Sequence, residues 1–109
     1  MRAETEHKAE KGVVRISLVA EKIALPETLR VTQLEITEDF FFHPEEKLTA
    51  LEAALQGTTF AQSRTQESYA SLEQKIAAFY QREGIVSPGL RPHDFAQAII
   101  KAMTSLEEG

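Results

Sequence analysis

Residues 36–57 read ITEDFFFHPEEKLTALEAALQG, and within this stretch the apolar residues change from a strand period to a helix period. The strand-like part covers residues 34–42, which begin just before this stretch and include its first seven residues. There, apolar side chains occupy every second position and one carboxylate interrupts them, at Leu34, Ile36, Glu38, Phe40 and Phe42. Such alternation is typical of a strand with one buried face. We therefore predict a strand that ends near residue 42.

The second half of the stretch predicts a helix of about three turns. Its apolar residues recur at intervals of three and four, at Leu48, Leu51 and Leu55. Pro44 suits the first helical turn, where a missing N–H has no cost. Glu45 and Glu46 place negative charge at the positive end of the helix dipole. Gly57 can adopt the left-handed conformation that ends a helix.

The three consecutive phenylalanines predict one outward-facing ring. Successive side chains of a strand point to opposite faces. If Phe40 and Phe42 face the core, Phe41 faces away from it. We expect the Phe41 ring to be exposed to water or covered by a partner protein.

The length and composition are those of an ordinary globular domain. The 109 residues are 42% hydrophobic and 27% charged, which predicts one domain over residues 1–109. There is no cysteine, no apolar run long enough for a bilayer and no signal-peptide pattern, so we expect a cytoplasmic protein away from membranes. The net charge of −5 argues against a nucleic-acid partner.

The pattern along the rest of the chain predicts two strands followed by three helices. Residues 1–10 are polar and are interpreted as a flexible arm. Strands are expected over residues 13–20 and 29–42, with a β-bulge near Thr32 and Gln33, where the apolar phase shifts. These strands form a long twisted hairpin, to which a third short strand can be added.

Two further amphipathic helices are expected at residues 66–83 and 92–106. Gly84 ends the first of them. Pro92 and Asp94 occupy the first turn of the second, where they suit its geometry and its dipole. Strands followed by segregated helices predict an α+β fold, with the helices packed on one face of a small antiparallel sheet.

The sequence contains no motif for catalysis. Its glycines are isolated, so no phosphate-binding loop is expected. The three histidines are not at ligand spacing and no cysteine can complete a metal site. His43 is interpreted as a capping or partly exposed turn residue, and Asp39 as an acceptor of backbone N–H groups. We therefore expect no catalytic, cofactor-binding or metal-binding residue, and no catalysis by this chain alone.

Residues 8–57 resemble the small accessory domain of lipoate–protein ligases. That pattern is a Lys/Gly-containing lead-in, two apolar strands, a Gly-Asp-Phe-Phe junction, and a short acidic helix with a Leu-Glu pair closing on Leu-x-Gly. The matching residues are Lys8, Gly12, Val13–Ile16, Val31, Leu34, Ile36, Asp39, Phe40, Phe41, Pro44, Glu45, Leu51, Glu52 and Leu55–Gly57. Glu38 stands where the family usually has glycine. Beyond Gly57 the match is loose.

The resemblance implies a fold and a function. The accessory domain is similar to iron–sulfur assembly scaffolds, which have an antiparallel sheet with helices on one side. The resemblance implies an accessory subunit of a two-part ligase, whose catalytic subunit uses ATP, Mg²⁺ and lipoate to make lipoyl-adenylate and then modifies lipoyl-domain acceptor proteins. The Arg-Arg-x-Ser-Gly-Gly-Gly segment and catalytic lysine of the large domain are absent here.

The resemblance assigns a partner interface to the motif residues and their neighbour His43: Lys8, Gly12, Asp39, Phe40, Phe41 and His43. From strand alternation we expect the sheet face that carries Phe41, together with Val13 and Val19, to dock on the catalytic subunit. Without its partner, the chain is expected to be able to self-associate through that face. The alternatives are a non-catalytic scaffold module of the same fold in another pathway and, less favoured, an independent enzyme.

Overall fold

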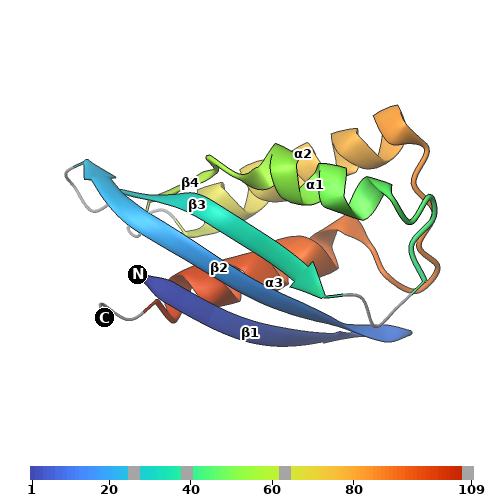
Figure 1. Cartoon of the computed structure of the whole chain (residues 1–109), viewed down its shortest axis with the longest axis horizontal. Coiled ribbons are helices and arrows are strands. Elements are labelled where there is room, and N and C mark those ends of the chain that lie inside the picture. Colours follow the sequence, from blue (N-terminus) through green and yellow to red (C-terminus); the bar gives the residue numbers. More distant parts are fainter. Residues whose placement is uncertain (25–27, 38–40, 62–64, 107–109) are drawn as a thin grey trace.

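The computed structural model describes residues 1–24, 28–37, 41–61 and 65–106. They form an antiparallel sheet with strand order β1-β2-β3-β4 and three helices on one of its faces (Figure 1). The elements, in chain order, are β1 (Arg2–Ala9), β2 (Gly12–Ala24), β3 (Thr28–Thr37), α1 (Lys47–Leu55), β4 (Thr59–Ala61), α2 (Thr65–Glu83) and α3 (Pro92–Thr104). The predicted α+β architecture is confirmed.

The core lies between the sheet and the helices because every strand turns its apolar phase inward. On β2 and β3 the buried residues follow the predicted alternation: Val14, Ile16, Leu18, Ala20, Leu29, Val31, Leu34 and Ile36. The helices contribute the predicted positions as well, among them Leu48, Leu51, Leu55, Leu72, Ile76, Phe79, Phe95, Ile99 and Met103. The outer face of the sheet, which no helix covers, carries the charged residues of the same strands.

The prediction that residues 1–10 form a flexible arm is wrong. Residues 2–9 are strand β1, which pairs with β2 in an unbroken register from Arg2 opposite Val19 to Ala9 opposite Gly12. The inward positions include Ala3 and Ala9, both buried. Alanine leaves room for α3 to pack closely against the strand, but it contributes little hydrophobic signal to a sequence pattern.

The predicted bulge is present in β3. Val19 lies opposite Gln33 and Ala20 lies opposite Val31, so Thr32 is the extra residue. Its side-chain hydroxyl donates a hydrogen bond to the Val19 carbonyl at 3.1 Å. The extra residue restores the inward phase, as the spacing of the apolar residues required.

Several element boundaries differ from those predicted. β3 ends at Thr37, whereas the predicted strand continued to Phe42. Of that extension, residues 38–40 lie outside the described residues, and Phe41 and Phe42 do not belong to a strand. Helix α1 begins at Lys47, so Pro44 and Glu45 precede the helix instead of forming its first turn. The sheet has two strands more than the predicted hairpin, β1 at one edge and β4 at the other.

The matched Leu51–Glu52 pair of α1 has a structural explanation. Leu51 is fully buried, and the Glu52 carboxylate accepts a hydrogen bond of 2.6 Å from the backbone N–H of Ile36. That N–H lies beyond the short stretch of β3 that pairs with β4. Glu52 thus supplies an acceptor on the open edge of β3, and a charged acceptor makes such a bond strong.

Gly57 and Gly84 end their helices with positive φ values of 89° and 65°, as predicted.

Among the described residues, no helix combines the length and the apolar character needed to cross a membrane.

Candidate docking surface

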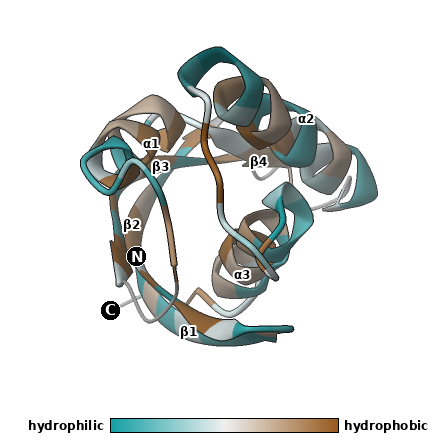
Figure 2. Cartoon of the chain, turned by 90° about the vertical axis from the view of Figure 1, so that its right-hand side faces the viewer, coloured by the Kyte–Doolittle hydropathy of each residue, from teal (hydrophilic) through white to brown (hydrophobic). Residues whose placement is uncertain are grey.

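One end of the molecule collects the loops that contain most of the predicted interface residues (Figures 1 and 2). We call this surface the loop end and define it as residues 8–12, 41–46 and 84–94. It combines the β1–β2 turn, the segment before α1, and the α2–α3 loop with the first turn of α3. These segments are far apart in sequence and come together because the strands and helices that precede them all finish at the same end of the sheet.

Two backbone contacts hold the loop end together. His43 and Val86 exchange hydrogen bonds, with N–O distances of 2.9 Å and 2.8 Å, and form an isolated antiparallel bridge. The Lys11 N–H donates to the Gly89 carbonyl at 3.4 Å. Gly89 has a φ of +76°, and a Cβ at this position would lie 2.6 Å from the Lys11 Cβ. Glycine therefore permits the α2–α3 loop to approach the β1–β2 turn.

The bridge presents an exposed apolar strip. Bridge partners and residues two positions away along a strand share one side, so Phe41, His43 and Val86 project together. Phe41 is 60% exposed and Val86 is 53% exposed. The rings of Phe41 and His43 are stacked, with centroids 6.3 Å apart and planes at 17°. We call Phe41, His43 and Val86 the apolar strip.

Phe42 anchors this strip to the core. Its side chain is only 5% exposed, and its ring meets the rings of Tyr80 and Phe95 edge-on, at centroid distances of 6.0 Å and 6.2 Å. Edge-to-face packing of this kind adds to the stabilisation that burial provides. The predicted arrangement of Phe42 turned inward and Phe41 turned outward is therefore confirmed.

A short hydrogen-bond chain holds the α2–α3 loop over this aromatic cluster. The Tyr80 hydroxyl lies 2.7 Å from the Ser87 hydroxyl, which donates to the Leu90 carbonyl at 2.6 Å. Because Ser87 uses its proton on Leu90, Tyr80 donates to Ser87. Burial is the largest cause that raises the pKa of Tyr80, to about 12. The Tyr80 hydroxyl therefore keeps its proton at neutral pH. The hydrogen bonds from Tyr80 to Ser87 and from Ser87 to Leu90 then keep their direction.

The structure brings most of the predicted interface residues to the loop end. Lys8 and Gly12 flank the β1–β2 turn, and Phe41 and His43 belong to the apolar strip. Asp39 and Phe40 lie outside the described residues. His43 is an exposed residue of the segment before α1 and one half of the bridge, whereas the N-cap of α1 is Glu46.

Sequence reasoning missed two features of this end. Val86 lies in an irregular loop, where no period marks it as exposed or paired. The cluster around Asp94 was also missed: Nε2 of His7 and Nε2 of His93 lie 3.0 Å and 3.4 Å from its Oδ1. The separation of 87 residues between His7 and Asp94 leaves no local signal for the contact.

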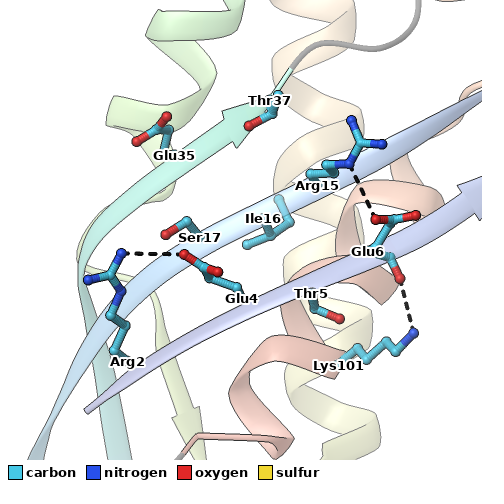
Figure 3. A pocket seen from close by; sticks show the side chains of 10 residues that line it. All are labelled: Arg2, Glu4, Thr5, Glu6, Arg15, Ile16, Ser17, Glu35, Thr37 and Lys101. Carbon is cyan, nitrogen blue, oxygen red and sulfur yellow. Dashed lines mark hydrogen bonds and ion pairs between the residues drawn. The ribbon is translucent and has the colours of Figure 1, made fainter.

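The outer face of the sheet has a different character from the apolar strip. A hollow of about 670 Å³ lies over β1, β2 and β3 (Figure 3). Charged side chains border it, and several pair with one another or with the backbone. Arg2 and Glu4 are 3.3 Å apart, Arg15 and Glu6 are 3.3 Å apart, and the Lys101 ammonium donates to the Glu6 carbonyl at 3.0 Å.

Val13 and Val19 lie on this outer face and are half-buried there. Their neighbours across the strands are mostly polar, such as Arg2 and Gln33 beside Val19. The geometry therefore favours the apolar strip over the sheet face as the docking surface. Within the described residues there is no group of three or more His, Cys, Asp or Glu placed to hold a metal ion.

Comparisons with known proteins identify the family. No family model matches the sequence. Lipoate-protein ligase A subunit 2 of Thermoplasma acidophilum is 32% identical to the chain over 92 residues, which are 84% of this chain and 81% of that protein. The chain belongs to the lipoate–protein ligase A subunit 2 family.

A solved structure gives the same answer for the fold. It belongs to an archaeal lipoylation system, a bipartite lipoate protein ligase and its E2 lipoyl domain from T. acidophilum. One of its chains matches with a TM-score of 0.67 and 30% identity, over 91% of this chain and 94% of that chain. The fold is thus shared over 91% of this chain, well beyond residues 8–57, to which the sequence resemblance is confined.

Proposed function

We propose that the chain is the accessory subunit of a two-part lipoate–protein ligase and supports ATP-dependent adenylation of lipoate by a separate catalytic subunit. The observation that carries the proposal is the family relationship to a ligase subunit 2, at 32% identity over 84% of the chain. The exposed apolar strip supports it, because an aromatic side chain held outward on an ordered backbone is a favourable anchor at a protein interface.

The chemistry belongs to the partner in this proposal. The complex uses ATP, Mg²⁺ and lipoate in the catalytic subunit, and the modified proteins are lipoyl-domain acceptors in the cytoplasm. The loop end docks on the catalytic subunit, orders its active site and excludes water from the acyl-adenylate. The family relationship favours this function over a scaffold module of another pathway.

The test is to measure lipoate-dependent ATP consumption by the catalytic subunit with and without an equimolar amount of this chain. We expect a rise of about tenfold or more, because ordering of reacting groups lowers the barrier. Each protein alone is the control, together with a reaction that lacks lipoate. An unchanged rate in the presence of a formed complex would show that the chain is not an accessory subunit for adenylation.

A further inference from the structure

Strand β1 leaves one edge of the sheet open in the described part of the chain. It is the outermost strand of the order β1-β2-β3-β4. The backbones of Met1 and Ala20 exchange two hydrogen bonds, of 2.9 Å and 2.8 Å. Along an antiparallel ladder, residues that bond to the neighbouring strand alternate with residues whose N–H and C=O groups point away from it. The even-numbered residues of β1 therefore turn these groups toward the open edge: Arg2, Glu4, Glu6 and Lys8.

Lys101 of α3 lies at the centre of this edge. Its ammonium donates a hydrogen bond of 3.0 Å to the outward carbonyl of Glu6 (Figure 3). Glu52 of α1 binds the free edge of β3 in a similar way, through the Ile36 N–H at 2.6 Å. A lysine at an exposed edge hinders pairing with a further strand, because that strand would have to displace the ammonium from the carbonyl and desolvate it.

The charges on β1 are complementary to those of a second copy of the same strand. Two copies related by a twofold axis pair antiparallel, and side chains directly opposite each other then interact. When Glu6 lies opposite Glu6 of the second copy, Glu4 lies opposite Lys8 on both sides of the axis. When Glu4 lies opposite Glu4, Arg2 lies opposite Glu6 on both sides. In each of these registers opposite charges flank a central pair of glutamates, and each register uses the Glu6 carbonyl.

The helices leave room for this approach. Helix α3 packs against both β1 and β2, so α3 of the second copy would lie about two strand spacings away. That distance is about 10 Å, which is usual for packed helices. In the register centred on Glu6, the two Lys101 ammonium groups would lie near the twofold axis, where their like charges oppose pairing.

We infer that Lys101 keeps the edge of β1 closed to β1 of a second copy, and that loss of its charge turns this edge into an interface between two chains. The inference goes beyond the proposed function, because it concerns the chain without its catalytic subunit. With this edge closed, the loop end is the surface through which the chain associates, and the sheet does not extend from one copy to the next.

The test is sedimentation equilibrium of the full chain over a series of concentrations. The reference chain carries Phe41→Ala, so that contacts through the apolar strip do not contribute. We expect Lys101→Ala in this background to lower the Kd of dimerisation by about tenfold or more. Lys101→Gln, which loses the charge but keeps a polar side chain, should have the same effect, whereas Lys101→Arg should behave as the reference. Circular dichroism verifies that the variants are folded.

The matched control is Lys75→Ala in the same background. Lys75 is an exposed lysine of α2 whose ammonium donates to the Thr58 hydroxyl at 3.5 Å, so its removal changes the net charge equally. The control should dimerise no more tightly than the reference, within about twofold. Equal dimerisation of the Lys75→Ala and Lys101→Ala chains would overturn the inference, as would Lys101→Ala and Lys101→Gln chains that dimerise no more tightly than the reference.

Glu6→Pro tests where the dimer contact lies. The Glu6 N–H faces the open edge, so proline leaves the pairing with β2 intact but removes a donor from the edge and places its ring there. The chain with Lys101→Ala and Glu6→Pro should return to the monomer. The chain with Lys101→Ala and Glu6→Gln keeps the N–H and should remain a dimer. A dimer that persists with Glu6→Pro would lie on another surface and would overturn the inference.

Discussion

Replacing Phe41 with alanine is expected to weaken the complex with the catalytic subunit by about 30-fold or more, because a buried aromatic anchor is worth about 2 kcal/mol or more at an interface. The isolated chain should keep its stability within about 0.5 kcal/mol, since the ring is 60% exposed and little packing is lost. Isothermal titration calorimetry measures the affinity, and urea denaturation measures the free energy of unfolding.

The matched control for Phe41→Ala is Ile23→Ala. Ile23 is also a large exposed apolar residue, at 39%, but it lies near the end of β2, away from the loop end. Its truncation should leave the affinity within about twofold of the wild type. If the two alanine variants bind equally well, the apolar strip is not the docking surface.

Replacing Phe42 with alanine is expected to lower the stability of the isolated chain, which Phe41→Ala leaves almost unchanged. The free energy of unfolding should fall by about 3–5 kcal/mol, the range found when a buried phenylalanine is truncated. The loss includes the edge-to-face contacts with Tyr80 and Phe95. Urea denaturation followed by circular dichroism measures it.

Phe42→Leu is the matched variant, because it keeps most of the apolar volume and loses only the ring geometry. Its destabilisation should be distinctly smaller than that of Phe42→Ala. A Phe42→Ala protein as stable as the wild type would mean that this side chain does not anchor the loop end. The two neighbouring phenylalanines are thus expected to have different roles: Phe41 contributes to the affinity for the catalytic subunit, and Phe42 to the stability of the chain.

Much of the fold could be predicted from local patterns. The alternation from Val14 to Ala20 and the helical spacing in α2 and α3 are strong because large side chains mark the buried phase. The bulge at Thr32 was predictable for the same reason, as the shift from Val31 to Leu34 breaks a strict alternation. Strand β1 could not be predicted, because its buried positions include Ala3 and Ala9. Alanine fits a strand, a helix or a loop equally well.

The candidate site was predictable only in part. Phe41 could be assigned to an exposed position because its neighbour Phe42 has to fill the core. The pairing of His43 with Val86 joins segments that are 43 residues apart in sequence and have no period of their own. The contact between His7 and Asp94 could not be predicted either, because it joins residues 87 positions apart. Self-association of the chain alone stays a prediction.

The most direct measurement of the central claim is hydrogen–deuterium exchange of the wild-type chain, free and bound to the catalytic subunit. We predict that residues 41–46 and 85–91 become strongly protected in the complex, because the catalytic subunit covers the loop end, while the exposed side of α2 exchanges at an unchanged rate. Unchanged exchange at both loop segments, with new protection on the outer face of β1 and β2 or on α2, would contradict the account.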